Sequence, residues 1–139
     1  MNNLQDLIKK EGDYLEWVYV SECGAEYLCK IKRHDSIKHL CGYVVLTKYN
    51  KFYGKEYDDI PVQVHGGLTF SGEVDGEWLI GFDCAHHGDI TPGCGYEHLS
   101  YMGTYKDMNF VKSECESLAE QISNYSTSKI RQVKLDKLI

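Results

Sequence analysis

Side chains able to bind a transition metal are concentrated in the middle of the chain. Four of the six histidines and two of the six cysteines lie between positions 65 and 98. The densest part is residues 83–89, Asp-Cys-Ala-His-His-Gly-Asp, which follow the apolar run 78–82. Zinc in proteins takes three or four ligands from thiolate, imidazole and carboxylate groups. The cluster therefore predicts a zinc site between His65 and Asp89.

The spacing within residues 83–89 allows two arrangements of ligands. In an extended strand the side chains alternate between the two faces, so Cys84 and His86 would share one face, and Asp83 and His87 the other. If the strand ends earlier, Asp83, His86 and Asp89 can converge instead. Either arrangement places ligands where a strand leads into a loop.

His65 would add a ligand that is distant in sequence. It precedes two glycines at 66–67, and their missing side chains let another group approach closely. The candidate ligands, in order of preference, are His65, His86 and Asp89, then Asp83 and Cys84, with Cys94 in reserve.

The same residues have a purely structural interpretation. Cys84 would then be a small buried apolar side chain, the usual fate of a free cysteine. Asp89 would be a turn residue, and His65 a half-buried imidazole within a hydrogen-bond network. The ligand spacing is not that of a regular zinc finger, so the prediction depends on the clustering alone.

Catalysis is a third interpretation. Cys84 could act as a nucleophile with His65 or His86 as its base, or a zinc ion with Asp83 or Asp89 as general base could hydrolyse a substrate. The sequence contains no G-x-S-x-G, H-E-x-x-H or phosphate-loop motif, and no deaminase signature. We therefore expect no enzymatic activity and assign no catalytic residue.

The elements that would position these residues are mostly strands. Alternating or β-branched runs predict strands at 14–20, 27–33, 40–46, 62–64, 68–74 and 77–83, with a short helix at 2–11. The 40–46 run is apolar enough for a central strand. Residues 22–25 fit a hairpin connection, and Asp75-Gly76 is a strong signal for a two-residue turn. Residues 87–103 show no period and are expected to form a long loop.

The most regular element is a helix predicted at 105–124. Its apolar stripe, which we expect to pack on the sheet, consists of Val111, Cys115, Leu118 and Ile122. Thr104 lies three residues before Asp107, as in an N-terminal cap. Cys29, Cys41 and Cys115 are expected in the core, and the 129–139 tail fits either a strand or a helix. Strands followed by one long helix predict an α+β fold, a largely antiparallel sheet packed by a helix in the C-terminal half.

Length and composition predict a single domain over residues 1–139. The chain has no apolar run long enough to span a membrane and no signal-peptide pattern near its start. We therefore expect a cytoplasmic protein with reduced cysteines.

The charges are unevenly distributed along the chain. Nine acidic residues and no lysine or arginine lie between Glu56 and Tyr105. Such a stretch attracts metal cations and basic protein surfaces and repels nucleic-acid phosphate. We expect a basic, nucleic-acid-handling protein as partner, with no direct nucleic-acid contact and no membrane. Basic residues within 30–55 leave open an alternative, a sponge for a nucleotide immune signal.

Three segments of the chain resemble a known group of proteins. They are residues 57–72 with the motif His-Gly-Gly-Leu-Thr at 65–69, residues 78–89 with Gly-Phe-Asp-Cys-Ala-His at 81–86, and residues 103–119. Together they resemble small proteins encoded by phages and prophages of Gram-positive bacteria, and most of all zinc-containing type II-A anti-CRISPR proteins, which inhibit Cas9. The resemblance covers roughly residues 40–122.

The resemblance implies a phage-encoded inhibitor of host defence that binds Cas9 and carries a structural zinc ion. The residues that match the motif are His65, Asp83, Cys84, His86 and Asp89. His87 stands where a small residue is expected, which makes it a weaker candidate. A zinc-dependent hydrolase of a small or nucleotide-like substrate, and the nucleotide sponge, remain the alternatives.

Overall fold

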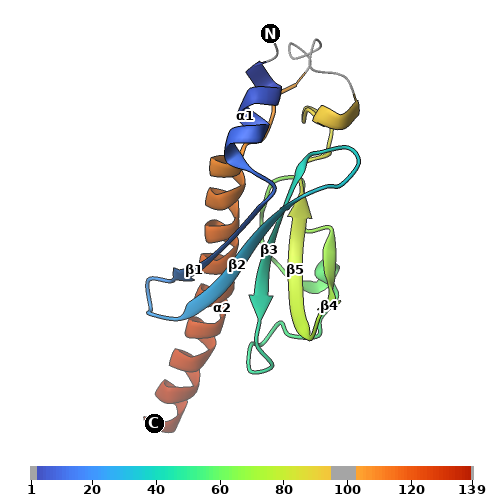
Figure 1. The fold of residues 1–139 in the computed structure, drawn as a ribbon. Coiled ribbons are helices and arrows are strands. Elements are labelled where there is room, and N and C mark those ends of the chain that lie inside the picture. Colours follow the sequence, from blue (N-terminus) through green and yellow to red (C-terminus); the bar gives the residue numbers. More distant parts are fainter. Residues whose placement is uncertain (1–2, 95–102, 139) are drawn as a thin grey trace.

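The fold is an antiparallel sheet with one long helix packed against it (Figure 1). The computed structural model describes residues 3–94 and 103–138, with side chains described as far as Tyr125. The elements in chain order are α1 (Asn3–Glu11), β1 (Tyr14–Val20), β2 (Glu26–Arg33), β3 (Leu40–Leu46), the 3-10 turn η1 (Tyr57–Asp59), β4 (Phe70–Val74), β5 (Glu77–Asp83), the 3-10 turn η2 (Pro92–Cys94) and α2 (Met108–Leu138). The predicted α+β class is confirmed.

The sheet has the strand order β1-β2-β3-β5-β4, and every neighbouring pair is antiparallel. The apolar β3 is therefore the central strand, as predicted. Asp75 and Gly76 have φ values of 50° and 84°, the left-handed conformation that a tight two-residue turn between β4 and β5 requires. The predicted Asp-Gly hairpin is confirmed.

The helix α2 covers one face of the sheet, which we call the inner face. The predicted stripe of Val111, Cys115, Leu118 and Ile122 is fully buried there, against side chains of β2 and β3 such as Ile31 and Val44. Burying such side chains contributes about 1.5–3 kcal/mol each. The sheet and the helix thus form one core, and Cys29 and Cys115 belong to it as predicted.

The two ends of α2 differ from the prediction. The cap is Asp107 and not Thr104, because the Asp107 carboxylate accepts the Phe110 N–H at 2.8 Å. The helix also continues beyond Asn124 to Leu138, so the tail is helical, and in Figure 1 it projects past the sheet.

The predicted strand at 62–64 was wrong. The backbone of Gln63 pairs with a side chain of α2 and not with a strand. Gln121 accepts the N–H of Gln63 and donates to its carbonyl, both at 2.8 Å. The N–H of His65 donates to Glu114 at 2.7 Å. These contacts fix His65 against the helix.

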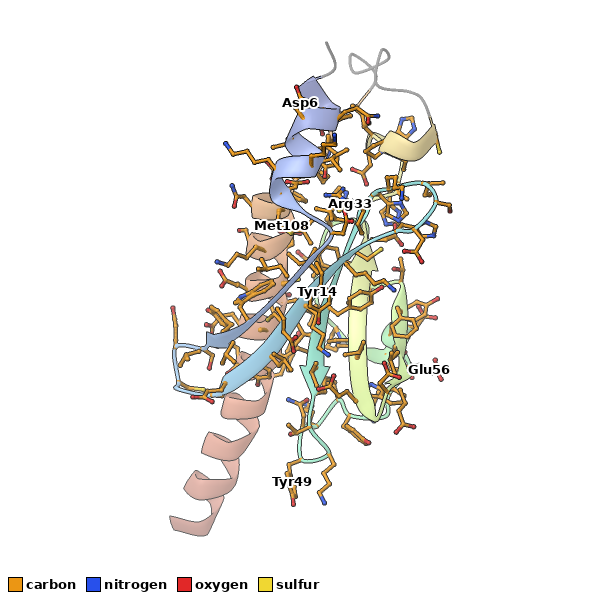
Figure 2. The ribbon with its side chains drawn as sticks, viewed as in Figure 1. Asp6, Tyr14, Arg33, Tyr49, Glu56 and Met108 are labelled. Carbon is orange, nitrogen blue, oxygen red and sulfur yellow. The ribbon has the colours of Figure 1, made fainter. Side chains whose placement is uncertain are left out.

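The opposite, outer face of the sheet is covered by no element that the structure describes. Tyr14, Val18, Phe70 and Val74 are exposed on it, as the front of Figure 2 shows for Tyr14. Cys41 also lies on this face, half-buried, so the prediction that it belongs to the core was wrong. Its neighbours Leu40 and Gly42 point inward instead.

Arg33 at the end of β2 ties the N-terminal helix to the sheet. Its side chain is only 3% exposed, and its guanidinium lies 2.9 Å from both Glu11 and Asp13. It also donates to the Tyr105 hydroxyl and to two backbone carbonyls. Burial acts to lower the pKa of Arg33, but the hydrogen bonds to Tyr105, Glu11 and Asp13 outweigh it and raise the pKa.

Candidate functional site

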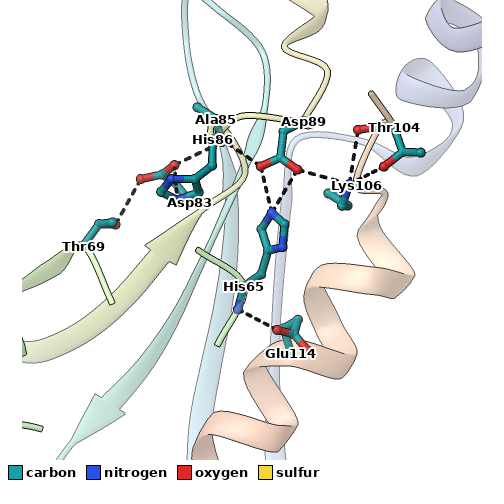
Figure 3. A network of polar contacts seen from close by, with 9 residues as sticks. All are labelled: His65, Thr69, Asp83, Ala85, His86, Asp89, Thr104, Lys106 and Glu114. Carbon is teal, nitrogen blue, oxygen red and sulfur yellow. Dashed lines mark hydrogen bonds and ion pairs between the residues drawn. The ribbon is translucent and has the colours of Figure 1, made fainter. Parts of the chain in front are cut away.

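His65 and Asp89, the two ends of the predicted zinc site, are in direct contact (Figure 3). His65 Nε2 lies 2.7 Å from Asp89 Oδ2 and 2.9 Å from Oδ1. The side chain of Asp89 is only 1% exposed. It also accepts the His86 N–H at 3.0 Å and lies 3.1 Å from Lys106 Nζ. Both carboxylate oxygens are therefore occupied.

The Asp89 carboxylate is held in its charged form. Burial acts to raise its pKa, but hydrogen bonds from His65, from the His86 N–H and from Lys106 outweigh burial and lower the pKa. An ionised carboxylate can only accept hydrogen bonds, so His65 Nε2 carries the hydrogen that is shared with Asp89. Lys106 was not among the residues predicted for the site, and its ammonium already neutralises the Asp89 charge that would attract a metal.

Asp83 and His86 form a second pair next to the first. Asp83 ends β5 and accepts hydrogen bonds from Thr69 and from the Ala85 N–H, each at 3.0 Å. His86 Nε2 lies 3.2 Å from Asp83 Oδ1, a charge contact only, because this nitrogen is buried without a hydrogen bond. β5 includes Asp83, and the convergence of Asp83, His86 and Asp89 that a strand end after Phe82 would allow stays a prediction.

Gly66 brings the two pairs together. The His65 and His86 rings are 5.9 Å apart, edge to face. A Cβ atom at Gly66 would overlap the His86 ring, and the φ of Gly66 is +70°. The close approach expected of the glycines after His65 is therefore made by His86.

Cys84 lies apart from both pairs. Its side chain is buried in the core between sheet and helix. Burial, followed by the charge of Asp89, raises the pKa of the thiol to about 12. It is a neutral thiol there and behaves as a small apolar side chain. Cys94, the reserve ligand, is exposed at the end of η2.

The five predicted ligands thus form two neighbouring pairs and one core cysteine. Among the residues whose side chains the structure describes, 4–94 and 103–125, no group of three or more His, Cys, Asp or Glu is placed to hold a metal ion. The chemistry of the donors suits zinc, but the Asp89 oxygens are taken by His65, His86 and Lys106. The zinc site therefore stays a prediction, and the His65–Asp89 pair fits it less well than Asp83 and His86 do.

Sequence reasoning missed two histidines that lie close to Asp83 and His86. His34 and His39 flank the turn between β2 and β3, and their rings stack with centroids 4.9 Å apart. Both line a cavity of about 510 Å³ on the outer face, together with Cys41, Asp83 and His86. They lie far from the 65–98 cluster in sequence, and only the pairing of β3 with β5 brings them near it.

Comparisons with known proteins identify no relative of this chain. No protein-family model, no curated protein and no solved structure significantly matches this chain. Within the part of the chain that is described, no helix is both long and apolar enough to cross a membrane.

Proposed function

We propose that this protein is a non-enzymatic inhibitor that binds a basic, nucleic-acid-handling protein in the cytoplasm of a bacterial host. One observation carries the proposal: five exposed carboxylates gather along the β4 edge of the sheet. The N–H of Tyr57 donates to Ser71 Oγ at 2.9 Å, which holds η1 beside β4. We call this surface the acidic edge; it consists of Glu56, Asp58, Asp59, Glu73 and Asp75.

The acidic edge is not neutralised from within the molecule. In the described part of the chain, none of its five carboxylates forms an ion pair. Other acids of the same stretch are engaged instead, Glu77 with Lys30 at 2.5 Å and Asp89 with Lys106. Unpaired carboxylates on one edge attract a surface rich in lysine and arginine, accelerate association with it, and repel nucleic-acid phosphate.

Cas9 is the candidate partner, because the chain resembles type II-A anti-CRISPR proteins. A Cas9 protein holds nucleic acid in a positively charged channel. A phage-encoded protein with an acidic edge has the charge needed to occupy such a channel and to block its action on target DNA. Inhibition of this kind needs no chemistry at the site described above.

Co-elution tests the proposal. Purified Cas9, with and without guide RNA, is mixed with the protein and passed over a sizing column at low and at moderate salt. We expect a complex that weakens as salt rises, because screening shortens the reach of exposed charges. Absence of a complex in every state would overturn the proposal.

A matched pair of variants shows whether the acidic edge is responsible. The variant Glu56→Lys/Asp59→Lys reverses two of its charges, and we expect it to weaken the complex at least about tenfold. The control, Glu22→Lys/Glu26→Lys, changes the net charge equally at the exposed β1–β2 turn, at the opposite side of the sheet. Equal weakening by both variants would show an effect of net charge alone.

The proposal includes a structural zinc ion, as the resemblance implies. Among the predicted ligands, His86 has an Nε2 that is buried without a hydrogen bond, and the neighbouring Asp83 carboxylate accepts from Thr69 and Ala85. When bound, zinc would link the end of β5 to a neighbouring segment. Elemental analysis of protein purified without added metal should find about one zinc per chain; less than about a tenth of that would refute the zinc part.

A second candidate, a sponge for a nucleotide signal, is favoured by a cavity on the outer face. This cavity of about 490 Å³ is lined by Lys30, Lys32 and aromatic residues that include Tyr43 and Phe70. Lysine and aromatic rings are the groups that bind phosphate and stack on a base. Lys30, however, is already paired with Glu77. Calorimetry with AMP and cyclic di-AMP tests this candidate, and no heat at millimolar ligand would reject it.

A further inference from the structure

The two edge strands of the sheet are protected to different degrees. At the β4 edge, the hydrogen bond from the Tyr57 N–H to Ser71 holds η1 alongside the strand. β4 is also short and carries the charged Glu73. At the other edge, β1 pairs with β2 alone, and no other element in the described part of the chain pairs with it. We call this side of β1 the open edge; Figure 1 shows β1 at the margin of the sheet.

β1 lacks the features that usually keep an edge strand from pairing. Those features are lysine, proline, bulges and short length. The strand Tyr14–Val20 reads Tyr-Leu-Glu-Trp-Val-Tyr-Val, and its register with β2 runs along the whole strand without a bulge. Val18 and Val20 are each 56% exposed. A regular apolar strand of this kind is a template on which another strand can form.

The ladder with β2 shows which backbone groups of β1 face the open edge. The Asp13 carbonyl accepts the Arg33 N–H at 2.9 Å, and the Ser21 N–H donates to the Ala25 carbonyl at 2.8 Å. Residues that bond to one neighbour alternate with residues that face away from it, so odd-numbered residues from 13 to 21 bond to β2. The outward-facing N–H and C=O groups are those of the even-numbered residues, Tyr14, Glu16, Val18 and Val20.

We propose that the open edge pairs with the open edge of a second copy of this chain. The two β1 strands run antiparallel about a two-fold axis at Trp17. Glu16 then pairs with Val18 of the second copy, and Tyr14 pairs with Val20 of the second copy. All four outward-facing residues of each copy exchange backbone hydrogen bonds in this register. Because the two-fold axis uses up both open edges, the contact forms a dimer and not a fibre.

The charge of Glu16 favours this register over its neighbours. An axis at Glu16 would set the two Glu16 carboxylates directly opposite each other, and like charges in that position destabilise a strand pair. An axis at Val18 would move Tyr14 beyond the end of the second β1, so that its outward-facing groups lose their partner. With the axis at Trp17, each Glu16 faces a valine and every outward-facing residue is paired.

The side chain at the proposed axis is already fixed by α2. Trp17 Nε1 donates to Glu116 at 3.0 Å, and Lys112 Nζ lies 5.7 Å from the ring centroid. The polar atom of Trp17 is therefore satisfied within its own copy, and its ring can offer apolar surface to the second copy. Residues that face each other without hydrogen bonds have the closest side chains in a ladder, and aromatic pairs there stabilise a sheet. α2 packs mainly on β2 and β3, away from the open edge.

The dimer leaves the acidic edge accessible. β4 and β1 lie at opposite sides of the sheet, so the joined sheet of two copies has one acidic edge at each end. Dimer formation goes beyond the proposed function and does not rest on any contact with Cas9.

Sedimentation equilibrium of the full chain over a range of concentrations tests the proposal. We expect wild-type protein to show a reversible equilibrium between monomer and dimer. Val18→Asp sets a carboxylate opposite Glu16 of the second copy, twice in each dimer, and should raise the dissociation constant at least about tenfold. Val18→Lys sets an ammonium in the same place and should dimerise at least as well as wild type.

A remote substitution controls for net charge. Tyr49→Asp adds the same charge as Val18→Asp at a side chain that is 86% exposed, in the turn that follows β3. It should change the dissociation constant less than about threefold, because exposed charges more than about 10 Å apart are largely screened at moderate salt. Circular dichroism shows whether each variant is folded, and the exposed position of Val18 lets both of its variants keep the core intact.

Three results would overturn the proposal. The first is monomeric wild-type protein at every concentration up to about 1 mM, which would leave the open edge to a strand of another protein or to none. The second is equal weakening by Val18→Asp and Val18→Lys, because Glu16 would then not lie opposite residue 18. The third is equal weakening by Val18→Asp and Tyr49→Asp. Co-elution with Cas9 is measured separately, so failure of the dimer and failure of the proposed function are distinguishable.

Discussion

His65 Nε2 donates to Asp89 Oδ2 at 2.7 Å and so joins two segments that are far apart in the chain. His65 precedes β4 and is fixed to α2 through Glu114, and Asp89 follows β5. Lys106, from the segment that leads into α2, completes the contact. The buried charge of Asp89 thus holds three segments together at one end of the sheet.

Replacing Asp89 should therefore destabilise the fold. Asp89→Asn removes the charge that His65 and Lys106 face, and we expect a loss of roughly 1.5–3 kcal/mol in the free energy of unfolding, the range for hydrogen bonds to charged groups. Urea unfolding measures it. The control is Asp75→Asn, an exposed carboxylate without an ion pair, which should change stability by less than about 0.5 kcal/mol. Equal effects would contradict this account.

The contribution of Asp89 should also depend on pH. Its pKa is lower in the folded chain than the ordinary value of about 3.9. The stabilisation is therefore fully present above that value and is lost as pH falls through the lowered pKa. The stability difference between wild type and Asp89→Asn should narrow between pH 5 and pH 2. If the stability difference between wild type and Asp89→Asn stayed constant over this pH range, the charge of Asp89 would not contribute to stability.

Gly66 should tolerate a side chain less well than other glycines with positive φ. Gly66→Ala has two costs, the strained left-handed backbone, about 1–2 kcal/mol, and a clash of the new Cβ with the His86 ring. Gly76→Ala has the same backbone strain, with φ +84°, but its Cβ would meet nothing within 4 Å. Thermal unfolding should rank Gly66→Ala clearly below Gly76→Ala. Equal melting temperatures for the two variants would contradict this prediction, because they would show that the His86 ring can move away from the new Cβ without loss of stability.

Arg33 should not be replaceable by lysine. Its planar guanidinium contacts Glu11, Asp13 and Tyr105 at the same time, and an ammonium cannot reproduce this fork. Arg33→Lys leaves part of a buried charge network unpaired, and we expect a loss of about 3 kcal/mol. The neighbouring exposed Lys32, changed to Met, is the control. If Arg33→Lys lowered the free energy of unfolding by less than about 1 kcal/mol, the simultaneous contacts of the guanidinium would not be needed for stability.

Removal of zinc should lower the melting temperature if the ion is structural, because metal-binding free energy is then part of folding free energy. One sample is treated with a strong chelator, which is then removed by dialysis, and a second sample is afterwards resupplied with zinc. The melting temperatures of the two samples are compared. An unchanged melting temperature after zinc is stripped would contradict a structural role.

Local patterns were enough to predict most of the fold. The period of Val111, Cys115 and Leu118 defined the inner face of α2, and Asp75-Gly76 defined a hairpin. The segment 62–64 misled the prediction because the backbone of Gln63 is satisfied by Gln121 of α2, a contact between distant residues that no local pattern contains.

The candidate site was less predictable, because it depends on strand register. Contact between His65 and Asp89 follows from their clustering, but the competition of Lys106 for Asp89 does not. The placement of Cys41 opposite Asp83 requires the pairing of β3 with β5, and His39 joins them only through that pairing. Strand register therefore decides which of these side chains lie near one another, and no local pattern in the sequence contains that register.

A cleavage assay tests the proposed inhibition of Cas9 most directly. Cas9 loaded with guide RNA cuts a linear target DNA in the presence of increasing amounts of this protein. We expect protection that becomes complete near equimolar inhibitor and that Glu56→Lys/Asp59→Lys weakens but Glu22→Lys/Glu26→Lys does not. Full cleavage at a large excess of wild-type protein, whether added before or after the guide RNA, would contradict the account.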